Sequence, residues 1–146
     1  MYWPAARASG HAVDARSESP RLSYGTFAAA HPRERTGDVR ARLEIRALEL
    51  DDSFTILDEL AARDLSGGPV HARASSSVVG TSIVEGARGA SACIVELAGG
   101  NVRRLRLRTS SYANWPAVAP AVVGNLLPDF PLINKSFELC YACADR

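Results

Sequence analysis

The chain has 146 residues, with 17 lysines and arginines against 16 aspartates and glutamates, so its formal net charge is +1. That length suits one domain with a modest core, and the balanced charge excludes the strongly basic surface typical of nucleic-acid-binding proteins. The sequence has no apolar run long enough to cross a bilayer and no apolar signal-peptide segment at its start. We therefore expect a cytosolic (cytoplasmic) protein that neither spans a membrane nor binds nucleic acid.

The segment at 1–36 is rich in Ala, Ser, Arg and Pro and shows no sustained helical or strand periodicity. We therefore expect a mostly irregular N-terminal segment there, followed by a folded domain at 37–146. A helix start signal lies at Thr36-Gly37-Asp38, because a short polar side chain can accept hydrogen bonds from the free amides of a first helical turn.

Apolar residues spaced by three and four predict a long helix from Val39 to Leu65, ended by Gly67-Gly68-Pro69. A helix of this length with one narrow apolar stripe needs a partner helix, and the chain has few others to supply it. The stripe consists of Val39, Leu43, Ala47, Leu50, Phe54, Leu57 and Ala61.

A polar loop is expected from Val70 to Ser77, followed by three strands that form one antiparallel, one-sided sheet. The last two strands are joined by Gly99-Gly100-Asn101, which tolerates the positive φ of a tight hairpin turn. Leucines alternate with arginines in the last strand, so we expect one of its faces to be buried and the other to be cationic. The strands are Thr81–Glu85, Ser91–Ala98 and Val102–Arg108.

Helical structure is expected again toward the C-terminus. Trp115-Pro116 opens a short helix that runs to about Gly124, because proline is tolerated in a first turn. The run from Pro128 to Pro131 predicts a turn, and Leu132 to Asp145 predicts a final helix that carries a cysteine pair. These elements together predict an α+β fold, mainly helical with a small antiparallel three-stranded sheet.

Cys140 and Cys143 form a C-x-x-C pair that a helix would place on one face, one turn apart. Two thiolates can bind a soft metal, form a redox dithiol, or simply be buried, and spacing alone leaves these three interpretations open. We expect positive charge near the two sulfurs from Arg146, which is close in sequence, and from Arg88, which could be close in space. Cys93 is expected to be an inert core residue. The three histidines show no metal-ligand spacing: His11, His31 and His71.

Arg88 follows a strand end and is bracketed by Gly86 and Gly89. Glycines allow close backbone approach and leave the guanidinium free to project, which suits a functional arginine, although a solvated turn arginine fits the same pattern. The arginines of 102–108 have no interleaved aromatic residues, so they favour a partner surface or salt bridges over nucleic acid.

Six segments in chain order resemble a known family: Arg7-Ala-Ser-Gly10, Asp14-Ala-Arg16, Gly37-Asp38 with Arg42, Glu85-Gly-Ala-Arg-Gly89, 106–118 and 124–146. They are similar to the C-terminal part of energy-converting nickel-iron hydrogenase large subunits of the formate-hydrogenlyase type. These subunits share ancestry with the D subunit of NADH-quinone oxidoreductase, complex I. The resemblance covers nearly the whole chain and implies a C-terminal piece of a larger helical subunit.

The resemblance implies a nickel-iron centre, of which this chain supplies half of the ligands. Cys140 would be a terminal nickel ligand, Cys143 would bridge nickel and iron, and Arg88 would lie over the metals and assist catalysis. The family usually has proline where this chain has Ala87. The implied partners are the N-terminal half of the large subunit, with the other cysteine pair, and the iron-sulfur small subunit. The complex would hold the chain peripherally on the inner face of the cell membrane.

Three functional hypotheses follow. The chain is the C-terminal portion of a hydrogenase large subunit, a fragment like the D subunit of complex I with a quinone-binding role, or a non-catalytic truncated remnant. Half of a four-thiolate site should bind nickel weakly, so we expect the isolated chain to be inactive.

Overall fold

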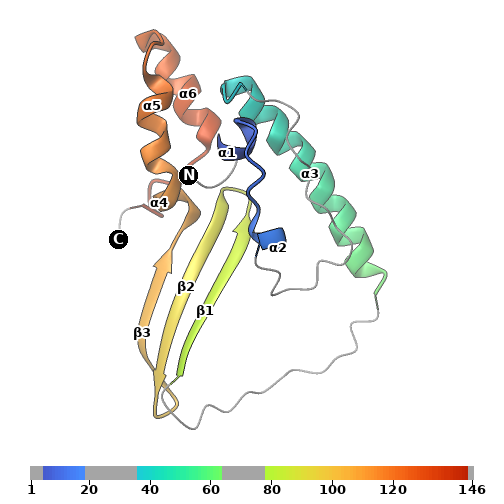
Figure 1. Ribbon diagram of the computed structural model, residues 1–146, viewed down its shortest axis with the longest axis vertical. Helices are drawn as coiled ribbons and strands as arrows, with labels where there is room; N and C mark the ends of the chain where they lie inside the picture. Colours follow the sequence, from blue (N-terminus) through green and yellow to red (C-terminus); the bar gives the residue numbers. More distant parts are fainter. Residues whose placement is uncertain (1–4, 19–35, 64–77, 145–146) are drawn as a thin grey trace.

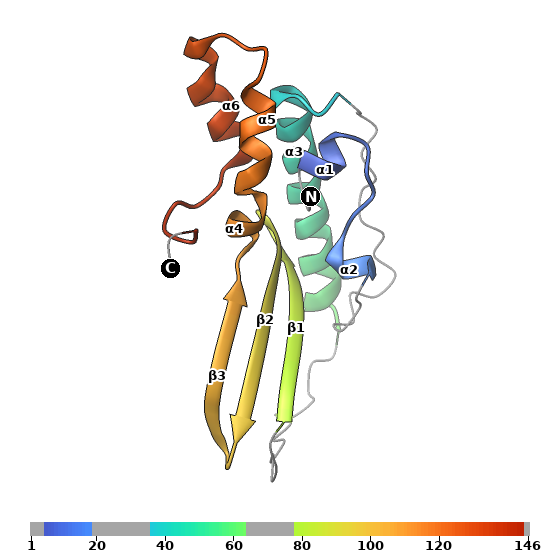
Figure 2. The same ribbon diagram turned by 60° about the vertical axis from the view of Figure 1, so that its left-hand side comes forward.

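The computed structural model describes residues 5–18, 36–63 and 78–144. It confirms an α+β fold with helices and one three-stranded antiparallel sheet in the order β1-β2-β3. The helices α4, α5 and α6 gather at one end of the sheet (Figures 1 and 2). The elements are α1 (Ala5–Ala8), α2 (Ala15–Glu18), α3 (Val39–Ala61), β1 (Val78–Gly86), β2 (Gly89–Ala98), β3 (Asn101–Arg108), α4 (Ser110–Asn114), η1 (Trp115–Ala117), α5 (Val118–Val122), η2 (Leu127–Asp129) and α6 (Phe130–Phe137).

The start of α3 is the one that the sequence predicts. The Asp38 carboxylate accepts a hydrogen bond from the Ala41 amide at 2.8 Å and caps the helix. Gly37 has φ +66°, and a β-carbon there would lie 2.5 Å from the Ser9 hydroxyl, so this close approach requires glycine. The helix ends at Ala61, earlier than the predicted Leu65, while the predicted stop signal and the loop at 70–77 lie outside the described residues.

The face of α3 that packs against the chain is not the predicted apolar stripe. The stripe is largely exposed, with Leu43 64%, Leu50 57%, Phe54 59% and Leu57 59% exposed. The neighbouring face is buried instead because it carries the small Ala41, which lies in one cluster with Ile45 and Ala8 of α1. The apolar stripe is therefore largely uncovered within the described part of the chain.

Arg42 joins α3 to α6 on this buried face. Its Nε donates to the Ser136 hydroxyl at 2.8 Å, and its guanidinium carbon lies 4.3 Å from the centre of the Phe137 ring. A buried guanidinium needs such partners because an unpaired charge is costly away from water. The adjoining apolar cluster contains Ala5, Ala117, Val118, Ile133 and Phe137.

The three strands lie where the sequence predicts, with longer ends. A two-residue turn, Ala87-Arg88, joins β1 to β2 with Gly86 paired to Gly89, and Gly99-Gly100 joins β2 to β3 with positive φ at both glycines. The expectation that β3 has one buried face is wrong, because all eight of its residues are exposed. The described part of the chain packs no layer against β3 that could bury its leucines.

The C-terminal helices differ from the prediction at both ends. The helical stretch begins at Ser110, ahead of the predicted Trp115, and Pro131 lies inside the first turn of α6 rather than in a separate turn. The predicted helix from Leu132 to Asp145 is wrong beyond Phe137. Glu138 adopts a left-handed conformation with φ +53°, which ends α6 before the cysteine pair.

Residues 5–18 form two single-turn helices that the sequence does not predict. Arg7 and Asp14 are buried there, α1 packs on α3, and α2 packs on β1. These contacts attach the N-terminal residues to the rest of the fold, while the division of the chain at 36/37 stays a prediction.

Candidate functional site

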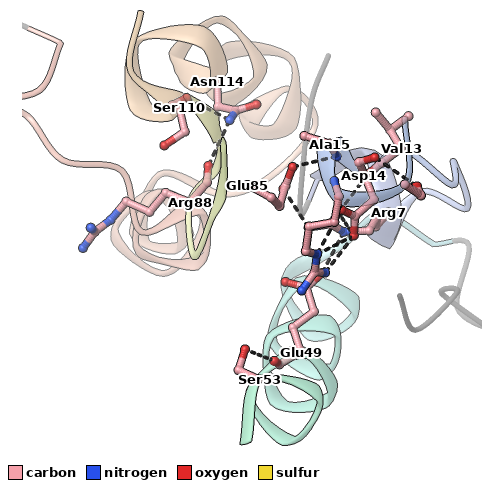
Figure 3. Close-up of polar contacts among 12 residues, drawn as sticks. Arg7, Val13, Asp14, Ala15, Glu49, Ser53, Glu85, Arg88, Ser110 and Asn114 are labelled. Carbon is pink, nitrogen blue, oxygen red and sulfur yellow. Dashed lines mark hydrogen bonds and ion pairs between the residues drawn. The ribbon is translucent and has the colours of Figure 1, made fainter. Parts of the chain in front are cut away.

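Arg88 lies at the tip of the β1–β2 turn, where its guanidinium is exposed. Two hydrogen bonds restrain it: its Nε donates to the Glu138 carbonyl at 2.6 Å, and its own carbonyl accepts from the Asn114 amide at 3.2 Å. The guanidinium points away from the buried charges beside Glu85 (Figure 3). The turn therefore presents a cation next to the residues that follow α6.

Cys140 and Cys143 lie in those residues, in a non-helical turn, and both are half-buried. Hydrogen bonds from the side chain and backbone of Cys143, together with the positive charge of Arg88, lower the pKa of Cys140 below its usual value. Tyr141, between the two cysteines, packs on the Trp115 ring with 5.1 Å between ring centres. The structure thus brings both cysteines and Arg88 into one region.

The short helix α4 connects these two parts of the site. The Cys140 amide donates to the Ser111 hydroxyl at 3.0 Å, and the Thr109 hydroxyl donates to the Cys143 carbonyl at 2.8 Å. Asn114, at the other end of α4, binds the Arg88 carbonyl. Sequence reasoning missed these three residues, although a Thr-Ser-Ser run directly after a strand is a recognisable helix-capping signal.

The pair of thiols fits one part of a soft-metal site. Thiolates are good ligands for soft metals, and a lowered pKa favours the thiolate form of Cys140. Across residues 5–18, 36–63 and 78–144, no group of three or more His, Cys, Asp or Glu could hold a metal ion. Cys93 is half-buried on β2 rather than in the core, and it does not complete the set. The pair therefore needs further ligands.

A cluster of buried charges lies on the other side of the β1–β2 turn (Figure 3). The Arg7 guanidinium forms ion pairs with Asp14 at 3.2 Å, Glu49 at 2.7 Å and Glu85 at 3.2 Å. Glu85 also accepts a hydrogen bond from the Ala15 amide at 3.0 Å. One guanidinium thus joins α1 to α3 and β1.

Burial sets the proton affinities of this cluster. It raises the pKa of Glu85 to about 7 despite the Ala15 amide and the nearby Arg7, and it raises the pKa of Glu49 despite Arg7 and Arg16. Burial also acts to raise the pKa of Asp14, but hydrogen bonds and charge from Arg16 outweigh it, so that pKa is lowered. Glu85 is therefore the carboxyl of this cluster that titrates near neutral pH.

A cavity of about 350 Å³ separates the charge cluster from the Arg88 side. Its lining includes Arg46, Glu49, Glu85 and Glu138. Burial lowers the pKa of Arg46, whose Nε and Nη2 have no hydrogen-bond partner among the described residues and whose ion pair with Glu138 is 4.0 Å long. These two buried nitrogens therefore have unused hydrogen-bonding capacity within the described residues.

Each helix within the described ranges is too short or too polar to cross a bilayer.

Comparison with known proteins reveals relatives over the whole chain. It is 33% identical to formate hydrogenlyase subunit 5 of Escherichia coli strain K12, over 98% of this chain and 26% of that protein. It is 30% identical to the carbon monoxide-induced hydrogenase of Rhodospirillum rubrum, and 30% identical to the NADH-quinone oxidoreductase D subunit of Desulfotalea psychrophila. In both cases the match covers 98% of this chain and 40% of the relative, so the chain spans well under half the length of these proteins.

A solved structure has the same fold over 98% of this chain and 42% of its own, with a TM-score of 0.82 and 26% identity. It belongs to the membrane-bound sulfane sulfur reductase, an archaeal respiratory membrane complex. The family model for the 49 kDa subunit of the respiratory-chain NADH dehydrogenase matches residues 2–82. The chain therefore belongs to the family of the 49 kDa subunit of respiratory NADH dehydrogenase.

Proposed function

We propose that this chain acts as the C-terminal portion of an oxidoreductase large subunit and contributes Cys140 and Cys143 to a nickel-iron centre. The assembly would interconvert dihydrogen with protons and electrons. The observation that carries the proposal is the convergence of Arg88 with the two cysteines through α4. The hydrogenase relatives, which match over nearly the whole chain, support the same conclusion.

Each residue has a distinct role in this proposal. Cys140 and Cys143 would hold the metals as thiolates. Arg88 would offset the negative charge of these thiolates and would place its protonated guanidinium beside them. When bound, the metals would supply the redox chemistry of dihydrogen. Arg88 is suited to its role because its charge already lowers the pKa of Cys140.

The remaining ligands and the covering surface would come from the rest of the large subunit. Its docking is supported by the exposed stripe of α3, where Leu50, Phe54 and Leu57 are each more than half exposed. An iron-sulfur small subunit would carry the electrons, and the complex would hold the chain peripherally at a membrane.

The test is the nickel content of the chain after co-expression with the remaining part of a large subunit, together with hydrogen-dependent dye reduction. We expect nickel to co-purify with the wild-type assembly and to be lost in Cys140→Ser and Cys143→Ser. Cys93→Ser is the matched control, because it removes a half-buried thiol from the sheet and should retain the metal. Metal-free wild-type assembly with reduced cysteines would contradict the proposal.

A second function is favoured by the match to the 49 kDa subunit family and to the D subunit of NADH-quinone oxidoreductase. In that case the chain would contribute to quinone binding without using its thiols. Quinone-linked electron transfer that survives the double variant Cys140→Ser/Cys143→Ser would support this role over the hydrogenase role. If the assembly shows neither hydrogen-dependent dye reduction nor quinone-linked electron transfer, the result would favour the third hypothesis, that the chain is a non-catalytic remnant.

A further inference from the structure

Asn114 is a buried amide that bridges two segments far apart in the sequence. Its side chain is 2% exposed, and its Nδ2 donates to the Ser110 carbonyl at 2.9 Å and to the Arg88 carbonyl at 3.2 Å (Figure 3). The first bond fixes the side chain on its own helix, and the second reaches the β1–β2 turn. A buried amide used in this way links the turn to α4.

The same helix holds the cysteine segment. The hydroxyl of Ser111, three residues before Asn114, accepts a hydrogen bond from the Cys140 amide. The side chains of Ser111 and Asn114 lie on one side of the helix, because residues three apart are neighbours on its surface. Ser111 is also 2% exposed. One helical turn therefore sets the spacing between the Cys140 backbone and the Arg88 backbone.

Besides the Asn114 bond, Arg88 is held by one side-chain hydrogen bond, from its Nε to the Glu138 carbonyl at 2.6 Å. Its guanidinium is exposed, and its turn is flanked by Gly86 and by Gly89, which has φ +113°. Glycines give such a turn several accessible conformations. The bond from Arg88 Nε to the Glu138 carbonyl can form only when the turn is placed correctly, so loss of the Asn114 bond should weaken it as well.

We propose that Asn114 is a positioning residue that fixes Arg88 relative to Cys140. It acts through the Arg88 backbone rather than by contact with a reacting group. This proposal rests on the function proposed above, and it deepens that function by assigning a residue that sets the aim of the arginine.

The first experiment measures solvent exchange of the Arg88 Nε proton by NMR in the 146-residue chain. Asn114→Leu keeps the buried volume and removes both donated hydrogen bonds. We expect exchange to accelerate about tenfold, as the loss of one net hydrogen bond allows. Asn125→Leu is the matched control, since Asn125 is exposed and donates only to carbonyls of 121–123 at the end of α5. An unchanged rate in folded Asn114→Leu would overturn the proposal.

A wild-type measurement decides the matter even if Asn114→Leu fails to fold. The side-chain amide protons of Asn114 should exchange slowly and show proximity to the backbone of Arg88 and Gly89. Exchange as fast as that of the exposed Asn125 amide would refute the positioning role.

In the metal-loaded assembly, Asn114→Leu should lower kcat more than it changes KM and should add little to the loss caused by Arg88→Lys, because the two changes act through one group. Additive losses would contradict the proposal. An assembly without nickel would refute the proposed function alone, since the exchange measurement on the chain decides the role of Asn114 separately.

Discussion

Glu85, near the end of β1, and Arg88, in the turn that follows, are three residues apart, yet their environments are opposite (Figure 3). The Glu85 side chain is 5% exposed and meets charged groups from α1 and α2, whereas the Arg88 guanidinium is exposed and makes one hydrogen bond, from Nε to the Glu138 carbonyl. The chain itself supplies the ion-pair and hydrogen-bond partners of Glu85. Arg88, by contrast, has an exposed guanidinium that another part of an assembly can reach.

We expect this difference to separate effects on stability from effects on the proposed site. Buried charges are costly unless paired, so changes on the Glu85 side should alter the free energy of unfolding. An exposed cation contributes little to stability, so changes on the Arg88 side should alter the site while the fold persists.

The largest effect is expected for Arg7→Met. It leaves the buried carboxylates of Asp14, Glu49 and Glu85 without their shared cation, and breaking such a network costs about 3–5 kcal/mol. Urea denaturation of the 146-residue chain measures this loss. Arg40→Met, which removes an exposed ion pair with Glu44 on the same helix as Glu49, is the control and should cost less than about 1 kcal/mol.

Glu85→Gln should change how stability depends on pH. The pKa of Glu85 is about 7 in the folded chain against 4.5 as its ordinary value, so the folded state binds the proton more tightly. Its stabilising contribution is full below about pH 4.5, is lost as pH rises through 7, and amounts to about 3 kcal/mol. The charged groups that act on it are Arg7, Asp14 and Arg16, and Glu49 shares the Arg7 guanidinium with it.

Thermal unfolding from pH 5 to 8 tests this slope. Glu85→Gln should flatten the fall in stability, while Glu96→Gln, which removes a carboxyl on the exposed sheet, should keep the wild-type slope. Equal slopes in all three proteins would show that Glu85 does not titrate in this range.

Thr109→Val should cost about 1–2 kcal/mol. The Thr109 hydroxyl caps α4 by accepting a hydrogen bond from the Tyr112 amide, and it donates a hydrogen bond to the Cys143 carbonyl. Valine keeps the shape of the side chain but can form neither bond. Denaturation midpoints of Thr109→Val and Thr109→Ser give the comparison. Serine should retain most of the stability, and a serine variant as unstable as valine would argue against the hydroxyl as the cause.

Glu138→Gly should be more stable than Glu138→Ala by about 0.5–1 kcal/mol, because glycine adopts the left-handed conformation at φ +53° without steric cost. Both variants remove the carboxylate, and only Glu138→Ala keeps the β-carbon. Calorimetry on the two variants separates backbone strain from the ion pairs with Lys135 and Arg46.

Arg88→Met should have the smallest effect on stability, below about 0.5 kcal/mol, since it removes an exposed cation and one hydrogen bond to a carbonyl that water can reach. Its contrast with Arg7→Met is the direct check on the two sides of the turn. A loss from Arg88→Met comparable to that from Arg7→Met would remove the distinction between them.

Local sequence signals predicted the fold well where local chemistry decides. Asp38 caps α3 because its own carboxylate reaches the first turn, and Gly99-Gly100 closes a hairpin because glycine accepts positive φ. The apolar stripe of α3 misled the prediction for a different reason. Its periodicity predicts one buried face, whereas the described chain buries the neighbouring face with Ala41, to which α1 packs closely.

The site was harder to predict than the fold. The C-x-x-C spacing and the glycine-bracketed Arg88 marked the residues, but the helical placement of the cysteines was wrong because Glu138 ends α6. The hydrogen bonds of Thr109, Ser111 and Asn114 depend on tertiary contacts between segments 26 to 34 residues apart, which no local pattern encodes.

X-ray absorption at the nickel edge of a co-expressed assembly probes the proposed thiolate role of Cys140 at the metal itself. We predict sulfur neighbours around nickel whose number falls in Cys140→Ser and stays unchanged in Cys93→Ser. Nickel surrounded only by nitrogen and oxygen, or a sulfur signal indifferent to Cys140, would contradict it.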